Sequence, residues 1–437
     1  MALMSKRQIA EQVKVMLNWR EAEQPVLDEL HDYLRNKQRH MWVPNTVPDE
    51  VRRIASMCRV NVLGLVIDSV AQSMYVDGYR ADTGTEAPAW DIWQRNKLDA
   101  RQVGIHRAML TYGVSYTTVL PGAPVAVIRG QSPRYLTAVY GEDDDWPMWA
   151  LEKRRSATRG ETLYRLFDDK YAYWVTADSA QNVEYVSHEE HGVGRVPVVR
   201  YLNKADLDDE VISDLDDLMN IQDQINFTTF GLLVCQHYGA HAQKWIAGWL
   251  AESTEEYLKA TAAKVWTFED PETKFGQFEP ATLDGYIESR KDSLRNLAAI
   301  SQTPAHALRG ELVNLSAEAL AAAEQSERRK ITEKETMAGE SWEQSLELAA
   351  EIDGLQSDPS AQVRWRDTEA RAFAATVDAL GKMVQMLGIP PEEVWEKVPG
   401  VTQQDVERWR ASLDEVDSFA RLEQMLARQG ASAVEAE

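Results

Sequence analysis

Consecutive aspartates give this chain its strongest local signal for metal chemistry. The run Asp143 to Asp145 follows Gly141, and carboxylate oxygens are the ligands that hard divalent cations prefer. Together with Asp168 and Asp169, the run could supply the metal site of a nuclease. Adjacent residues cannot all point at one ion, and no histidine or lysine is spaced to assist them. The sequence therefore favours a hydrophilic turn, and a metal-dependent nuclease is kept only as a minor alternative.

Other candidate metal ligands are weaker. His237 and His241 could share one face of a helix, but zinc needs three or four ligands and no third is evident. The acidic run from Asp206 to Asp217 lacks the glycine that a calcium loop has at its sixth position, so we interpret it as a solvated face. Cys58 and Cys235 lie among apolar residues, as buried thiols of a reducing compartment do. We predict no metal site and no cofactor.

Catalytic motifs are also missing from the sequence. It contains no Walker A, G-x-S-x-G, H-E-x-x-H or C-x-x-C pattern. The densest basic patch falls on predicted strands, where alternate side chains face opposite sides, so it is weaker than its density suggests. Its members are Lys153, Arg154, Arg155, Arg159 and Arg165. We therefore predict that the protein is not an enzyme.

The charge of the chain is unevenly placed. The net charge is −23, yet residues 1–203 hold 25 Lys or Arg and 26 Asp or Glu, a net charge of −1. Residues 204–437 hold 22 and 44, a net charge of −22. An acidic surface does not hold nucleic acid through its phosphates, but it can surround nucleic acid without binding it.

The first half of the chain combines helices with short strands. Apolar spacing predicts helix over residues 1–40 with a break at Pro25, and a second helical run from Val51 to Met74. Short β-rich runs then follow from Val114 to Val186, separated by turn residues, and predict an antiparallel sheet. No run of 18 apolar residues and no N-terminal signal core is present, so we expect no membrane contact.

The second half is mainly helical. We predict helices over Ala205–His241 and 281–302, with a mixed segment including short strands between them, such as Lys264–Phe268. Thr303-Pro304 ends the second helix, because proline disfavours the α conformation in the residue before it. Ser316 is placed as the N-cap of a helix from Ala317 to Asp353, about 55 Å long. The fold class is α+β, mainly helical.

The long helix has a thin apolar stripe between many charged residues. Such a helix spans between domains or packs against copies of itself. A coiled coil is less favoured, because the apolar positions do not follow a strict heptad.

Four groups of residues then follow one another in a characteristic order. They are Arg59-Val60-Asn61 through Gly78-Tyr79; Trp93 through Asp99 with His106 through Tyr116; Gly194 through Val199 with Asn203 and Gln222-Asp223-Gln224-Ile225-Asn226; and Ile300 through Pro304, Leu308-Arg309-Gly310 and Leu315 through Leu320. Their order and spacing resemble the portal proteins of tailed bacteriophages, specifically the long-tailed siphophage type of actinobacterial phages. No single motif is diagnostic, and the resemblance covers most of the chain.

The resemblance implies a portal-type fold with a wing, a helical stem, a small α/β clip and a short helical crown. The implied segments are residues 1–204 as the wing, 205–240 as the first stem helix, 241–280 as the clip, 281–302 as the second stem helix, 303–315 as a tunnel loop, 316–359 as a long wing helix with its linker, and 360–437 as the crown with a disordered tail.

The function implied by the resemblance is that of a conduit. Twelve copies would form a head–tail connector ring at one vertex of the capsid in the virion, assembled in the host cytoplasm. The ring would pass double-stranded DNA during packaging and ejection and contact terminase, the head–tail adaptor, and the major capsid and scaffold proteins. Other interpretations are an adaptor, a minor capsid protein or a generic helical scaffold.

The same resemblance suggests which residues line the channel. Arg290, Lys291 and Arg295 lie on the implied second stem helix, and His306 and Arg309 lie in the implied tunnel loop. Some of these side chains would face the bore and touch DNA weakly. The equally weighted alternative is that they form ion pairs between subunits with the acidic first stem helix.

Overall fold

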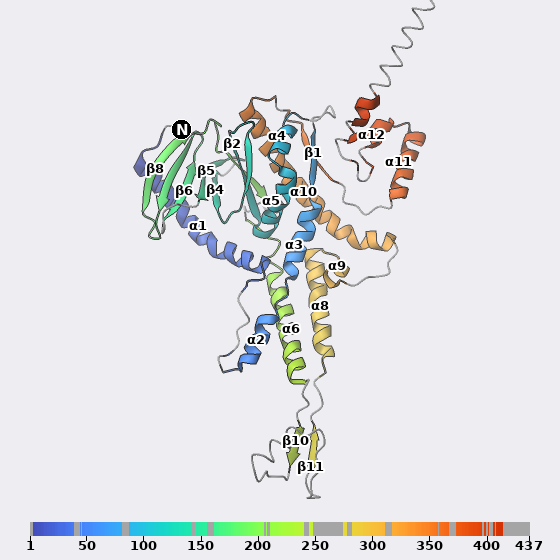
Figure 1. Ribbon diagram of the computed structural model, residues 1–437. Helices are drawn as coiled ribbons and strands as arrows, with labels where there is room; N and C mark the ends of the chain where they lie inside the picture. Colours follow the sequence, from blue (N-terminus) through green and yellow to red (C-terminus); the bar gives the residue numbers. More distant parts are fainter. Residues whose placement is uncertain are drawn as a thin grey trace, which may run out of the picture. The chain divides into compact units, whose positions relative to one another are not determined.

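The computed structural model describes most of the chain and has an α+β fold. The described residues are 3–38, 44, 46–80, 87–141, 145–154, 161–204, 207, 210–239, 244–247, 274–277, 282–310, 317–356, 358–366, 373–395, 397–398, 401, 405–406 and 408–413. The chain divides into two compact units. The first contains Met1–Pro25, Ser69–Ser213 and Ile331–Glu437, and the second contains Val26–Asp68 and Asp214–Lys330. Figure 1 labels the elements of both.

Two antiparallel sheets form the centre of the first unit, where the sequence predicts one sheet region. A three-stranded sheet has the order β3-β2-β9, made of β2 (Val114–Leu120), β3 (Val127–Gln131) and β9 (Val198–Leu202). A five-stranded sheet runs in chain order through β4 (Leu136–Tyr140), β5 (Pro147–Arg154), β6 (Thr162–Phe167), β7 (Tyr171–Ala177) and β8 (Val183–Glu190). The antiparallel pairing is confirmed throughout.

Helix α1 (Lys6–Leu34) covers the five-stranded sheet with its N-terminal half (Figure 1). Its apolar stripe, including Met16 and Leu17, packs against strand residues such as Leu166 and Tyr173. The predicted break at Pro25 is wrong, because the helix continues through it. A proline inside a helix removes a single backbone hydrogen bond. Side chains buried both before and after Pro25 offset that loss.

The predicted helical run from Val51 to Met74 is two helices. Helix α2 (Asp49–Met57) and helix α3 (Val62–Ser73) are separated at residues 58–61. The segment Asp49–Ser73 is long and apolar enough to span a membrane, with a mean hydropathy of 1.5, and 56% of it is buried within the protein. Core helices of water-soluble proteins have the same character, so this is weak support for a span.

A small sheet in the first unit joins distant parts of the sequence. Strand β1 (Val76–Arg80) pairs with β12 (Gln362–Trp365), and Arg364 Nε lies 3.1 Å from Asp77 Oδ1. Strand β12 lies within residues 360–437, the segment implied as the crown, and pairs with a strand of the segment implied as the wing. Helices α11 (Phe373–Leu387) and α12 (Pro391–Trp395) follow it.

Around α10 (Ala317–Asp353), the first unit has an aromatic centre formed with α4 (Trp90–Arg95) and α5 (Leu98–Tyr112). The rings of Trp93 and Trp342 meet edge to face at 4.7 Å. Trp342 Nε1 donates to His106 Nε2 at 2.9 Å, which leaves Nδ1 of the neutral ring to donate to the Met74 carbonyl at 3.1 Å. Burial lowers the pKa of His106 to about 4. The bounds predicted for the long helix are confirmed.

The second unit contains helix α6 (Met219–Gly239), helix α8 (Asp284–Ser301), helix α9 (Ala305–Arg309) and the first part of α10. Strands β10 (Lys244–Ala247) and β11 (Lys274–Gln277) pair between α6 and α8. Helix α6 begins at Met219, so the predicted start at Ala205 is wrong. Helix α9 occupies part of the predicted loop 303–315. The predicted strand Lys264–Phe268 and the predicted cap Ser316 lie outside the described residues.

Candidate functional site

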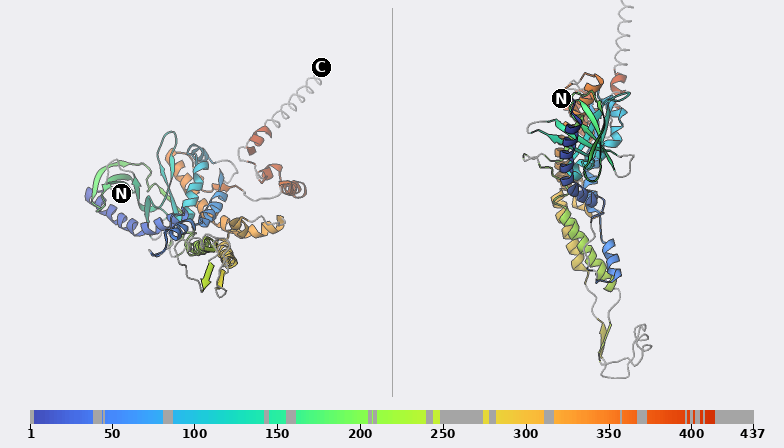
Figure 2. Two further views of the ribbon diagram at one scale, coloured as in Figure 1. Left: turned by 60° about the horizontal axis from the view of Figure 1, so that its bottom comes forward. Right: turned by 90° about the vertical axis from the view of Figure 1, so that its left-hand side faces the viewer.

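Helices α6 and α8 form the part of the second unit to which sequence reasoning assigns the function. Both figures that show the whole chain place them side by side and antiparallel (Figures 1 and 2). Their contact is close where Gly231 faces Tyr286, because a Cβ on Gly231 would lie 2.7 Å from a ring carbon. Glycine therefore allows the tyrosine ring to lie against the backbone of α6. The buried face of α8 is formed by Leu294, Leu297 and Ala298.

The surface of this helix pair is unusually apolar. From Gln224 to Gly239, α6 contains no Asp, Glu, Lys or Arg. Phe227 is 66% exposed, and further exposed apolar side chains on the two helices are Tyr238, Tyr286, Ile287 and Ile300. Exposed apolar side chains gathered on one pair of helices indicate a site of contact with another molecule.

Two buried amides fix the start of α6. Gln222 Oε1 accepts the N–H of Val62 at 3.1 Å, and its Nε2 donates to the Val60 carbonyl at 2.7 Å. Asn226 Oδ1 accepts the N–H of Val60 at 3.1 Å and also the amide of Gln222 at 3.1 Å. This amide clamp satisfies the backbone at the break between α2 and α3. Two of the sequence groups quoted above therefore meet, which their separation along the chain does not reveal.

A buried lysine joins the start of α6 to the end of α8. Lys330 Nζ lies 2.7 Å from Asp214 Oδ2, in the turns before α6, and donates to the Ser301 carbonyl at the end of α8 at 3.2 Å. The Lys330 and Asp214 side chains are 9% and 3% exposed. A cation is favourable at the C-terminal end of a helix, where the carbonyl groups lack partners within the helix. The acidic run is thus partly a structural anchor and not only a solvated face.

The three basic residues predicted on α8 divide between two faces. Lys291 Nζ lies 3.4 Å from Glu288, and Arg295 NH1 lies 2.6 Å from Asp292. These four side chains form a stripe of balanced charge along the helix. Arg290 lies on the other face, is half-buried, and its Nε has no hydrogen-bond partner within the described chain. Lys291 and Arg295 pair within their own helix, with no ion pair to α6 among the described residues.

The two predicted loop residues lie on α9. This helix follows Pro304 and ends at Gly310, whose φ of 64° is the left-handed conformation that closes helices. His306 is half-buried, and its carbonyl accepts the N–H of Gly310 at 3.0 Å. The Arg309 side chain lies outside what the structure describes.

Among the residues considered for a nuclease, the described Asp168 has a structural role. Asp168 is fully buried, and its carboxylate accepts the backbone N–H groups of Lys170 and Tyr171 and the hydroxyl of Tyr173. It therefore fixes the turn between β6 and β7. Asp143 and Asp144 lie outside the described residues, as does His241. Within the part of the chain that is described, no three His, Cys, Asp or Glu side chains are placed to hold a metal ion.

Of the described members of the basic patch, Arg165 is buried, Arg154 is half-buried and Lys153 is exposed. Arg165 NH2 and Arg154 NH2 lie 2.6 Å and 2.9 Å from the two carboxylate oxygens of the buried Glu152. Burial lowers the pKa of Arg165, and the adjacent Glu152 opposes that shift. Arg155 and Arg159 fall outside the described residues. The expectation of a weak patch is confirmed for Arg154 and Arg165.

Comparison with known proteins identifies the family. The family described as phage portal protein, SPP1 Gp6-like, matches residues 14–418. The chain belongs to the phage portal protein family. It is 27% identical over 413 residues to the portal protein of Mycobacterium phage D29, covering 86% of this chain and 83% of the relative. It is also 27% identical to the portal protein of Mycobacterium phage L5, covering 77% and 74%.

Solved structures support the fold of this portal protein. A chain from the virion of a native gene transfer agent particle matches with a TM-score of 0.51 and 14% identity, covering 83% of this chain and 96% of its own length. A chain from the neck of that particle, computed with C12 symmetry, matches with a TM-score of 0.50 and 13% identity over 80% and 91%. The protein is thus a structural component of the virion, of a family that is not enzymatic.

Sequence reasoning named the charged side chains of this site and missed its structural polar groups. Gln222 and Lys330 lie in patterns that are equally compatible with solvent exposure. A polar residue at an otherwise apolar position of a helix was the available signal for Gln222, because buried polar groups need hydrogen-bond partners.

Proposed function

We propose that copies of this portal protein form a closed ring, with α6 and α8 as its stem. In this proposal β10 and β11 belong to the clip, residues 303–315 with α9 form the tunnel loop, and the first unit forms the wing together with α10. The crown follows Arg366. The observation that carries the proposal is that α6 has no Asp, Glu, Lys or Arg from Gln224 onward, and its exposed apolar side chains need a protein partner.

A ring of identical subunits provides such a partner at every position. Each α6 would pack against the neighbouring subunit, so its exposed side chains would become buried in the assembly. Twelve subunits is the number we propose, supported by the C12 symmetry named for the similar neck structure. Double-stranded DNA would pass through the ring during packaging and ejection.

The balanced stripe on α8 suits a channel. DNA that must slide cannot be held by many Lys or Arg contacts, because each phosphate contact adds to affinity. Lys291 and Arg295 are each neutralised by a carboxylate one turn away. They would therefore touch DNA only weakly. Among the five predicted channel residues, Arg290 is the one whose half-buried guanidinium would serve packing.

The remaining partners follow from the same proposal. Terminase and later the head–tail adaptor would contact the clip, and scaffold and major capsid proteins would surround the ring at a capsid vertex. Assembly would take place in the host cytoplasm.

The direct test is negative-stain electron microscopy of the full chain, with mass photometry beside it. We expect rings with a central hole and a mass near twelve subunits. Phe227→Arg should raise the concentration needed for ring formation at least tenfold, because a charge at an apolar contact is desolvated without a partner. Val186→Arg changes an exposed residue of β8 and serves as the matched control. A chain that stays monomeric at high concentration, also with scaffold protein present, would overturn the proposal.

A further inference from the structure

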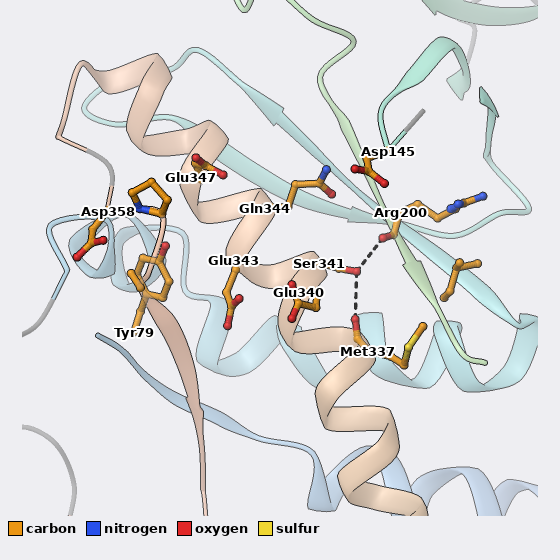
Figure 3. Close-up of a pocket in the computed structure, with 13 residues that line it drawn as sticks. Tyr79, Asp145, Arg200, Met337, Glu340, Ser341, Glu343, Gln344, Glu347 and Asp358 are labelled. Atoms are coloured by element: carbon orange, nitrogen blue, oxygen red, sulfur yellow. Dashed lines mark hydrogen bonds between the residues drawn. The ribbon is translucent and has the colours of Figure 1, made fainter. Parts of the chain in front are cut away.

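Two hollows on the first unit have opposite charge. The first, which we call the acidic pocket, has a volume of about 440 Å³ and is lined by five carboxylates (Figure 3). They are Asp145, Glu340, Glu343, Glu347 and Asp358. The single cationic side chain in its lining, Arg200, lies over the ring of Tyr140 at 4.0 Å. The pocket therefore carries a strong excess of negative charge.

Tyr79 adds a polar group to the lining of the acidic pocket. This residue is 4% exposed and lines the pocket, and its hydroxyl forms no hydrogen bond within the described chain. Burial, followed by the charges of Glu343, Glu347 and Asp358, raises the pKa of Tyr79 to about 12. A buried hydroxyl usually has a partner. A group that enters the acidic pocket could supply that partner.

The carboxylates do not converge as metal ligands do. Glu343 Oε1 accepts the N–H of Val363 at 2.9 Å, and Asp358 Oδ1 accepts from Ser360. No group of three such side chains in the described residues could hold a metal ion. Glu340 and Glu347 make no ion pair with a described residue. A cationic side chain, which can bridge separated carboxylates through several donors, fits this arrangement better than an ion.

The second hollow, which we call the basic groove, has the complementary chemistry. Its lining contains Arg101, Arg107 and Arg129 and no Asp or Glu. Arg101 and Arg129 are exposed and form no ion pair with a described residue. Gly104 and Gly130 also line the groove, so that little side-chain bulk obstructs the guanidinium groups.

The two hollows lie at opposite edges of one sheet. Arg129 belongs to β3 and Arg200 to β9, and these are the two edge strands of the order β3-β2-β9. A ring is built from heterologous contacts, in which one surface of a subunit meets a different surface of the next. Complementary charges at opposite edges of one rigid sheet are what such a contact requires.

We propose that the basic groove of one subunit binds the acidic pocket of the next, with the Arg101 and Arg129 guanidinium groups facing Glu340 and Glu347. The partner is thus a second copy of this chain, and the proposal rests on the ring proposed above. Either arginine could also donate to the hydroxyl of Tyr79. Complementary charge of this kind selects the correct register of neighbours, because like charges in the same place repel.

The test is a charge swap in the full chain. Glu340→Arg with Glu347→Arg should raise the concentration for half-maximal ring formation at least tenfold, and Arg101→Glu with Arg129→Glu should do the same. The chain that carries all four substitutions should recover rings, because attraction is restored with the signs exchanged. Raising the salt concentration should weaken rings of the wild type, since exposed charges are screened.

Two control variants test whether a charge reversal outside the acidic pocket and the basic groove also affects ring formation. Glu333→Arg lies on an exposed position of α10 outside the acidic pocket, and Lys14→Glu lies on an exposed position of α1. Both should form rings as the wild type does. Circular dichroism and melting temperature should be unchanged in every variant.

Two outcomes distinguish this inference from the ring proposal. Normal rings from both reversed double variants would overturn the interface and leave the ring proposal standing. If the wild type forms no rings, a mixture of Arg129→Cys and Glu340→Cys chains, with Cys58 and Cys235 replaced by serine, still decides. A flexible bismaleimide cross-linker, long enough to replace the two removed side chains, should join them into a heterodimer, because an arginine–glutamate contact holds the backbones too far apart for a direct disulfide. A yield no higher than that of a Lys14→Cys and Glu333→Cys mixture would overturn the contact.

Discussion

Helix α10 buries charged side chains and helix α6 exposes apolar ones, which is the reverse of the usual arrangement. Helix α10 is rich in charge, yet its Lys330 and Lys334 are 8% and 1% exposed. Helix α6 is free of acidic and basic residues from Gln224 onward, yet its Phe227 is 66% exposed. The buried lysines of α10 find partners within the subunit, whereas the apolar surface of α6 does not. Apolar side chains that remain exposed, as on α6, therefore indicate where another molecule binds.

Removing the charge of Lys330 should lower the free energy of unfolding more than any of the substitutions that follow. Lys330→Ala leaves the buried Asp214 without its cation, and loss of one partner of a buried pair costs about 3–5 kcal/mol. Chemical denaturation should show this drop in the free energy of unfolding. Glu333→Ala, on an exposed position of the same helix, is the control. Lys330→Met with Asp214→Leu should recover much of the loss, and a single variant as stable as wild type would contradict the anchor.

Acid should weaken the aromatic centre that α10 contributes to. The unfolded chain protonates His106 near pH 6.5, while the folded protein keeps it neutral until about pH 4. Stability should therefore fall as the pH is lowered through this window, by about 3 kcal/mol in total, and fall no further from this residue below it. Melting temperatures across the window would show a flatter pH dependence in His106→Gln. An identical slope in the two proteins would contradict the assignment.

A substitution of Gln222 tests whether the amide clamp, the buried polar part of α6, contributes to stability. Gln222→Ala leaves the Val62 N–H and the Val60 carbonyl without their partner, which should cost about 1–3 kcal/mol. Gln224→Ala, an exposed neighbour on the same helix, should change stability by less than about 0.5 kcal/mol. Equal effects of the two substitutions, measured by urea denaturation, would argue against the clamp.

The balanced stripe of α8 should show the smallest effect on stability. Lys291→Ala with Arg295→Ala removes exposed pairs worth about 0.3–0.5 kcal/mol each, so the melting temperature should barely change. The stripe would become acidic, and DNA packaging measured in a complemented phage should change while rings persist. Arg290→Ala should instead affect stability more than packaging. Loss of rings in the double variant would favour ion pairs between subunits.

Several elements could be predicted from local patterns alone. The β-rich region that begins at Val114 and the bounds of helix α10 are confirmed, because alternation of apolar residues and the positions of proline and glycine determine such boundaries. The errors occur where distant contacts compete with local preference. Pro25 lies inside α1, and the acidic segment before Met219 forms turns in which Asp214 binds Lys330.

The candidate site was predictable to a similar extent. The positions of Arg290, Lys291 and Arg295 on one helix follow from its period, and the portal family follows from the order of the sequence groups. Their division between a buried and an exposed face does not, because it depends on which side of α8 packs against α6.

The sequence by itself determined the helical and β-rich segments, the acidic second half and the portal family, since these depend on neighbouring residues and on order along the chain. Only the tertiary structure decided which polar groups are satisfied within the subunit. Lys330, Gln222 and the carboxylates around Tyr79 are all polar residues whose partners the sequence does not reveal. Their roles differ because hydrogen bonds and ion pairs act over a few ångströms in space, between residues far apart in the chain.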